Sequence, residues 1–296
     1  GYSRILISKK TGITIVGYLL SLTGILLAGL VLTTRFLGNP WSEDSLASVL
    51  IWTGWWMGLT WITLIVGNAW PFLDPWNTLR RIFGQGLGLS LSVRLGYPKF
   101  LGAWPAVFAL TAFIWFELGW LQAGEPQAII NVFLIFTAWL WIGMTIFEPD
   151  IWWKNANPFS RFFEVLGRFA PIEKRKGNLE IRMPGSALHE SRLSHPSESI
   201  IVILVLFAVT FDGFVATPEW WVLLRKMMLQ SCKILPKGVA FHVSFLIAIL
   251  AGMGIFSVFY WLVCRWMARL TNWKWKPWEL AGNFTMTLIP IAAAYH

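Results

Sequence analysis

Four side chains that could bind a metal ion or carry a proton lie near the ends of hydrophobic segments in this sequence. They are two carboxylates, Glu117 and Asp212, and two imidazoles, His242 and His296. Such groups are costly inside a bilayer, so those that occur there tend to be functional. Two imidazoles with two carboxylates suit copper or zinc. The same four groups could instead form a proton-accepting polar cluster.

The position of these residues depends on segments that are long enough to cross a bilayer. The chain is 56% hydrophobic and only 13% charged, whereas a soluble domain carries about 25% charged residues. Apolar runs of roughly 17 to 25 residues can span a membrane as helices. We therefore predict an all-α integral membrane protein, a bundle of about seven transmembrane helices with short interfacial helices. The expected helices are 13–34, 49–69, 100–121, 128–147, 199–216, 239–263 and 280–296.

The basic residues predict the orientation of this bundle. With a cytoplasmic N-terminus, the inner segments 1–12, 70–99, 148–198 and 264–279 hold 19 of the 24 Lys and Arg residues. Basic residues collect on the cytoplasmic side, so we expect this orientation, in a bacterial cytoplasmic (inner) membrane. We treat residues 1–296 as one transmembrane domain. We also expect a longer chain at both ends, because the last apolar segment stops abruptly at its final residue.

This orientation brings the four polar residues to one depth, on the outer side of the membrane. Equal depth does not establish lateral distance, so three interpretations stay open: a metal site, a proton-linked cluster, or separate interfacial residues. We do not expect a haem held by two histidines. Only His242 lies well inside a predicted helix, and His296 is the sole candidate for the second haem ligand.

An internal repeat marks the predicted cytoplasmic segments 70–99 and 148–198. Residues 74–84 read DPWNTLRRIFG and residues 157–167 read NPFSRFFEVLG. Each begins with Asp or Asn as a helix N-cap, followed by Pro at the first helical position. We interpret both as short helices lying on the inner membrane surface, or alternatively as a docking surface for a partner subunit. The basic residues expected to face lipid phosphates or a partner are Arg80, Arg81, Arg161 and Arg168.

Other features support a membrane protein and argue against a soluble enzyme. The 21 Trp residues cluster near predicted helix ends, where the indole favours the membrane interface. The apolar stretch from Trp220 to Leu229 predicts an amphipathic helix on the outer surface. The small-residue spacing of Ala248 and Gly252, and of Gly54 and Gly58, indicates close helix contacts. Phosphate-binding, dinucleotide, HExxH and GxSxG motifs are missing. The net charge of +9 is explained by the cytoplasmic loops, so we expect no nucleic-acid partner.

Several longer stretches resemble one family. They read GNAWPFLDPWNTLRRIFG, YPKFLGAWPAVFALTAFIWFEL, IFEPDIWWKNANPFSRFFEVLGRFAPI, VTFDGF and LIPIAAAYH. Over about residues 60–296 the chain resembles bacterial integral membrane proteins commonly labelled fenitrothion hydrolase or its particulate subunit. The label implies hydrolysis of an organophosphate ester, which requires a water activated by a metal or a general base. The resemblance transfers no catalytic residues to positions in this chain.

Three functions follow as hypotheses. The leading one is a subunit of a larger membrane assembly, in contact with lipids and other membrane subunits, with a link to metal or electron handling. The second is a membrane-bound, metal-assisted hydrolase, as the family label implies. The third is a proton-coupled transporter using Glu117 and Asp212. A transporter usually has broken helices near the membrane centre, and the sequence predicts none.

Overall fold

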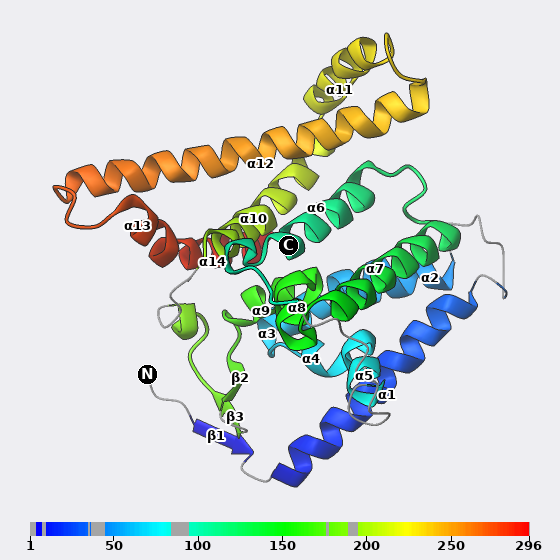
Figure 1. The fold of residues 1–296 in the computed structure, drawn as a ribbon, viewed down its shortest axis with the longest axis vertical. Coiled ribbons are helices and arrows are strands. Elements are labelled where there is room, and N and C mark those ends of the chain that lie inside the picture. The colour runs from blue at the N-terminus through cyan, green and yellow to red at the C-terminus, as the bar shows by residue number, and fades with distance from the viewer. Residues whose placement is uncertain are drawn as a thin grey trace. The chain divides into compact units, whose positions relative to one another are not determined.

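A computed structural model of the chain describes residues 4–7, 10–34, 36, 45–83, 95–175, 178–188 and 195–295, and these residues are mostly helical (Figure 1). Within them, six helices are long and apolar enough to cross a membrane. They correspond to the first six predicted segments and fit a multi-pass membrane protein. Their bounds are Ile15–Thr33, Leu46–Ile65, Lys99–Gly119, Pro126–Ile146, Pro196–Val215 and Lys237–Leu270.

The predicted seventh helix, 280–296, is not continuous. The chain forms α13 (Pro277–Phe284), then a 3-10 turn over Thr285–Leu288, then α14 (Ile289–Tyr295). Pro290 explains the break, because proline has no backbone N–H and is tolerated only in the first turn of a helix. A new helix therefore starts just before it. Apolar run length alone predicts one helix over this stretch, because it takes no account of the proline.

The described residues group into two compact units. Unit 1 comprises residues 1–101 and 124–190, and unit 2 comprises residues 102–123 and 191–296. The elements of unit 1 are β1 (Arg4–Ile7), α1 (Lys10–Thr33), α2 (Leu46–Ser48), a π-helix (Val49–Gly58), α3 (Leu59–Ile65), α4 (Trp70–Leu73), α5 (Pro75–Arg81), α7 (Pro126–Ile146), α8 (Pro149–Ala156), α9 (Pro158–Gly167), β2 (Ile172–Arg175) and β3 (Asn178–Ile181). Those of unit 2 are α6 (Trp104–Gly119), α10 (Pro196–Val215), α11 (Pro218–Ser231), α12 (Lys237–Leu270), α13 and α14.

The second candidate span of unit 1 has an unusual first half. Val49–Gly58 forms a π-helix that continues into α3. Such wide turns are rare, mostly short, and frequent at functional sites. Two indoles of this stretch pack against α9: the ring centroid of Trp55 lies 4.7 Å from that of Phe159, and Trp56 stacks on Phe162 at 4.7 Å. The π-helix is therefore coupled to the second repeat helix by aromatic contacts.

Two glycines of unit 1 permit close approach between helices. A Cβ added at Gly24 of α1 would lie 1.9 Å from the carbonyl oxygen of Leu73, which ends α4. A Cβ added at Gly143 of α7 would lie 1.9 Å from the indole of Trp152 on α8. Both distances are shorter than any van der Waals contact. Glycine at these positions therefore permits the close contact of α4 with α1 and of α8 with α7. The strands add a small antiparallel sheet in the order β1-β3-β2.

In unit 2, α10 packs against α6, α12 and α14. A Cβ at Gly252 of α12 would lie 2.5 Å from the ring of Phe207 on α10, so the predicted small-residue contact at Gly252 is confirmed. The pair Gly54 and Gly58 differs: added Cβ atoms there would meet only backbone of their own helix. Further along α12, the Tyr260 hydroxyl donates to the carbonyl oxygen of Ala281 at 2.9 Å and holds α13 against α12.

Candidate functional site

The predicted outer-side residues are distributed over three helices of unit 2. Glu117 on α6 is partly buried, Asp212 on α10 is exposed, and His242 near the start of α12 is partly buried. His296 lies outside the described residues. Among the residues that the structure describes, no three or more His, Cys, Asp or Glu side chains come close enough together to hold a metal ion. Copper or zinc binding by this set stays a prediction.

His242 nevertheless has a defined hydrogen-bonding geometry. Its Nδ1 lies 3.1 Å from the carbonyl oxygen of Gly119. A carbonyl oxygen can only accept, so Nδ1 carries a proton in this contact. The ring stacks on Trp120 with centroids 4.4 Å apart, and the Trp115 indole donates to the His242 carbonyl oxygen at 3.1 Å. These contacts join α12 to the end of α6 and direct the chemistry of the imidazole to Nε2.

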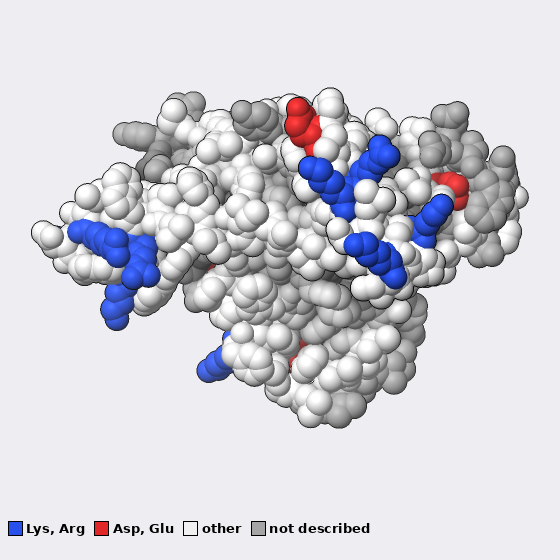
Figure 2. Space-filling view, turned by 90° about the horizontal axis from the view of Figure 1, so that it is seen from above, with Lys and Arg blue, Asp and Glu red and all other residues white. Residues whose placement is uncertain are grey.

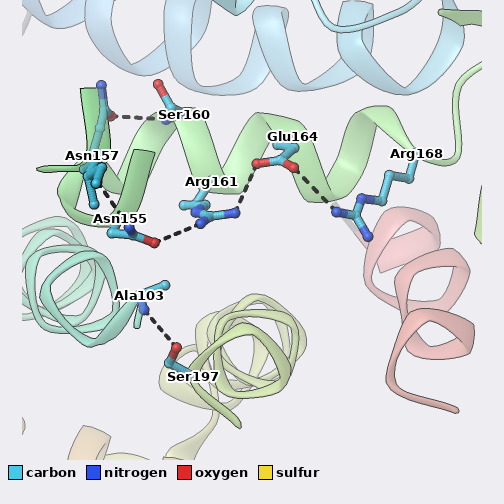
Figure 3. Close-up of polar contacts among 9 residues, drawn as sticks. Ala103, Asn155, Asn157, Ser160, Arg161, Glu164, Arg168 and Ser197 are labelled. Carbon is cyan, nitrogen blue, oxygen red and sulfur yellow. Dashed lines mark hydrogen bonds and ion pairs between the residues drawn. The ribbon is translucent and has the colours of Figure 1, made fainter. Parts of the chain in front are cut away.

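A second polar arrangement, in unit 1, is buried. Asp74 is 1% exposed and Asn157 is 0% exposed. Asp74 Oδ1 accepts from the backbone N–H of Asn77 at 3.1 Å, which caps α5. Asn157 Oδ1 accepts from the backbone N–H of Ser160 at 3.0 Å, which caps α9 (Figure 3). Asn157 Nδ2 then donates to Asp74 Oδ2 at 3.2 Å. The two caps thus form one hydrogen-bonded pair, here called the cap pair.

Local sequence explains each half of the cap pair. Asp and Asn are favoured N-caps because a short side chain can reach the second or third backbone N–H of the helix. Proline at the first helical position loses no hydrogen bond. The predicted caps at Asp74 and Asn157 are therefore confirmed, and α9 ends at Gly167 as predicted. The expected stop at Gly84 lies outside the described residues.

Aromatic rings of both repeats enclose this region. Trp76 and Phe159 hold equivalent positions, each two residues after its cap. Both pack edge-on against Phe136 of α7, with centroid distances of 4.8 and 4.9 Å. Trp70 lies 6.4 Å from each of them. The two repeats therefore share one aromatic core with α7, and its rings help to exclude water from the caps.

Burial without a direct cationic partner changes the acidity of Asp74. Loss of hydration raises the pKa of this carboxyl to about 7, while its hydrogen bonds from Asn77 and Asn157 and the charge of Arg80 act to lower it. Both oxygens of the carboxyl accept hydrogen bonds, which favours the ionised form, yet desolvation dominates. The Arg80 guanidinium is held by Asp150 and by Asn77 Oδ1. Asp74 can consequently exchange a proton near neutral pH.

The four arginines predicted to face lipid occupy different environments. Arg161 is 6% exposed and donates to Glu164 at 3.2 Å and to Asn155 at 3.1 Å (Figure 3). Arg168 also pairs with Glu164, at 3.3 Å. Arg80 pairs with Asp150 and lies over the ring of Trp153, 5.5 Å from its centroid. Arg81 is exposed. The structure thus gives Arg161 a role inside unit 1, and Arg81 presents its charge to the surroundings.

Searches of protein-family models, curated proteins and solved structures found no match to this chain. The site therefore rests on its geometry. The sequence predicts Asp74 only as a helix cap, and it places the candidate proton-accepting cluster at Glu117, Asp212, His242 and His296. The sequence signal that points to Asp74 is the repeat, which places Asp74 and Asn157 at equivalent positions; the structure adds that the two side chains meet.

Proposed function

We propose that this chain is a membrane-embedded subunit of a larger membrane assembly. The supporting observation is the exposure of α12. Of its most apolar 18-residue stretch, only 6% of the residues are buried within the chain. Its outward face combines small residues with bulky ones. Ala251 is exposed, a Cβ at Gly254 would meet nothing within 4 Å, and Ile255 and Phe259 are 67% and 69% exposed.

The mixture of small and bulky residues favours a helix from another chain over lipid alone. In a bilayer, helices associate through close backbone approach at small residues and through interdigitating side chains, because lipid tails are as apolar as leucine. Ala251 and Gly254 provide the approach, and Ile255 and Phe259 flank it. A neighbouring helix could lie along this face, and α12 would then be covered on both sides.

A photo-crosslinking experiment tests this proposal. A benzophenone side chain replaces Phe259 on α12, and a matched control replaces Ile135 on α7, which is also 69% exposed. Irradiation of native membranes is expected to give a protein adduct of defined mass from position 259 and lipid adducts from position 135. Lipid adducts alone from both positions would overturn the assembly role.

The proposed location is a bacterial cytoplasmic membrane, with the N-terminus in the cytoplasm. The support is the distribution of basic residues, since the predicted inner segments 1–12, 70–99, 148–198 and 264–279 hold 19 of the 24 Lys and Arg residues. This bias toward the cytoplasm is the main determinant of orientation in helical membrane proteins. The two repeat helices would then lie on the cytoplasmic side.

The cap pair supports a second candidate, a proton-linked role for the chain. Asp74 is a buried carboxyl that titrates near neutral pH, and such groups are candidates for proton transfer. It replaces Glu117 and Asp212 as the favoured acceptor. The π-helix in the same unit is a span of irregular backbone, as transporters use near their sites.

A link of the assembly to metal or electron handling, and the hydrolase activity that the family resemblance implies, both depend on the set around His242. Metal analysis of the purified chain and of His242→Ala tests both. Stoichiometric copper or zinc that disappears in the variant is the expected result for a metal site. Metal content unchanged by the substitution would remove His242 from any such role.

A further inference from the structure

The uncharged length of α12 matches the full thickness of a bilayer. Between Lys237 and Arg265 the helix carries no Lys, Arg, Asp or Glu. These two residues are 28 positions apart, which corresponds to about 42 Å at the rise of an α-helix. A bilayer with its headgroup regions measures about 40–45 Å. When α12 crosses the membrane, Lys237 and Arg265 consequently lie in opposite headgroup layers.

The segment after Arg265 is basic and aromatic in alternation. Residues 265–284 contain four basic residues and one acidic residue. Exposed indoles lie among the basic residues of the α12–α13 turn, which is defined here as residues 265–278. These indoles are Trp266 (62% exposed), Trp273 (53%), Trp275 (47%) and Trp278 (61%). The basic residues, all exposed, are Arg265, Arg269, Lys274 and Lys276.

The backbone of the turn is held in a defined shape. The helix ends in a double hydrogen bond: Trp273 N–H donates to the Ala268 carbonyl oxygen at 2.8 Å, and Asn272 N–H donates to that of Arg269 at 3.0 Å. Asn272 and Trp273 have φ values of 51° and 57°. Asn tolerates this left-handed region, but for a bulky residue such as Trp it is a costly conformation that surrounding contacts must maintain.

The start of α13 fixes the second end of the turn. Glu279 Oε2 accepts from the Lys276 backbone N–H at 3.1 Å, so the single carboxylate of the segment is used as a helix cap. Leu280 packs against Cys264 and Ala268 on α12. The basic side chains of the turn are therefore left with little acidic compensation, on a backbone that is fixed at both ends.

We propose that the α12–α13 turn binds the headgroups of anionic phospholipids. Its basic side chains would contact lipid phosphates, and its indoles would lie at the boundary between headgroups and acyl chains, the position that Trp favours. The depth set by α12 favours lipid over an acidic protein as the occupant. In Figure 2, basic side chains gather at the left edge, where Figure 1 places this turn.

The opposite end of α12 offers an internal comparison. Lys233 and Lys237 provide charge there as well. Lys233, however, donates to Gln230 at 2.7 Å, and this end lacks the alternation of Lys and Trp. If the turn binds anionic lipid specifically, the lipid should be retained there more strongly than at the Lys237 end.

Native mass spectrometry of the full chain, released from nanodiscs of phosphatidylcholine and phosphatidylglycerol in equal amounts, tests this inference. The variant Lys274→Gln/Lys276→Gln is compared with the control Lys233→Gln/Lys237→Gln. Wild type should retain phosphatidylglycerol over phosphatidylcholine. The turn variant should lose retained phosphatidylglycerol by about fivefold for each charge removed, and the control should lose much less.

Two results would overturn the inference. One is an equal loss of retained phosphatidylglycerol in both variants. The other is equal retention of phosphatidylglycerol and phosphatidylcholine by wild type, a measurement that does not depend on the insertion of either variant. A benzophenone at Trp275 that yields only protein adducts in native membranes would identify an acidic protein as the occupant instead.

Discussion

At the scale of single residues, the cap pair shows how burial and hydrogen bonding oppose each other on one carboxyl. Asp74 accepts two hydrogen bonds that favour its charged form, and its burial favours the neutral form. The sequence predicted both caps because the Asp-Pro and Asn-Pro signals are local. It did not predict that they touch, because 83 residues separate Asp74 from Asn157. That contact depends on tertiary packing around Phe136.

Asp74 predicts a pH dependence of stability with a definite sign. Its pKa rises from 3.8 to about 7 on folding, so the folded state binds more protons than the unfolded state between about pH 4 and pH 7. Stability should therefore fall as the pH rises through this window and level off above it, by an amount on the order of 4 kcal/mol at most. Thermal unfolding in detergent from about pH 5 to pH 8 measures it. Asp74→Asn should flatten the profile, and a variant that keeps the wild-type slope would refute the assignment.

Exchange of the two caps provides a sharper test. In Asp74→Asn alone, the new amide must accept from the Asn77 N–H, so its NH2 faces the NH2 of Asn157, and we expect a loss of about 1–3 kcal/mol. In Asp74→Asn/Asn157→Asp, donor and acceptor face each other again. The double variant should recover much of the stability in chemical or thermal unfolding, with the titrating carboxyl now at position 157. Additive losses from the two substitutions would mean that the side chains do not interact.

At the scale of elements, apolar run length was a sufficient guide for six of the seven predicted helices. It failed at 280–296, where Pro290 interrupts the helix, and it gave no sign of the π-helix at Val49–Gly58. Hydropathy records which residues avoid water, but it does not specify the hydrogen-bond register of the backbone. In the π-helix, this register occurs together with aromatic packing of Trp55 and Trp56 against α9.

Close helix contact predicts unequal effects of two glycine substitutions. Gly143→Ala should destabilise unit 1 by about 1–3 kcal/mol, because the new methyl group would overlap the Trp152 indole and must displace α8. Gly29→Ala on α1 is the control, since a Cβ there meets nothing within 4 Å. It should be neutral or stabilise the helix by up to about 1 kcal/mol. Melting temperatures in detergent compare the two, and similar values would argue against the α7–α8 contact.

At the scale of the whole molecule, the six long apolar helices fit a multi-pass membrane protein. The distribution of basic residues predicts the orientation of the chain, and this orientation stays a prediction. The sequence does not predict the grouping into two units. The grouping depends on the packing of α6 with α10 and α12, which are distant from it in the sequence.

The proposed orientation predicts which cysteine reacts from outside the cell. Cys232 follows α11 and is exposed, whereas Cys264 is buried within α12. A membrane-impermeant maleimide added to spheroplasts should label the chain once, at Cys232, and Cys232→Ser should abolish the labelling. Inside-out vesicles provide the control and should give little label. Strong labelling of inside-out vesicles alone would reverse the orientation.

The charged ends of α12 have a consequence for the kind of membrane that suits this chain. The uncharged run between Lys237 and Arg265 exceeds the hydrocarbon thickness of about 30 Å. In a bilayer of ordinary thickness this excess places the two charged ends in the headgroup layers. In a thinner bilayer the helix must tilt to keep its apolar residues out of water, and this hydrophobic mismatch has a cost that grows with each ångström. The length of α12 therefore selects a bilayer thickness. Acyl-chain length should determine the tilt of the helix and the membranes in which the chain is most stable.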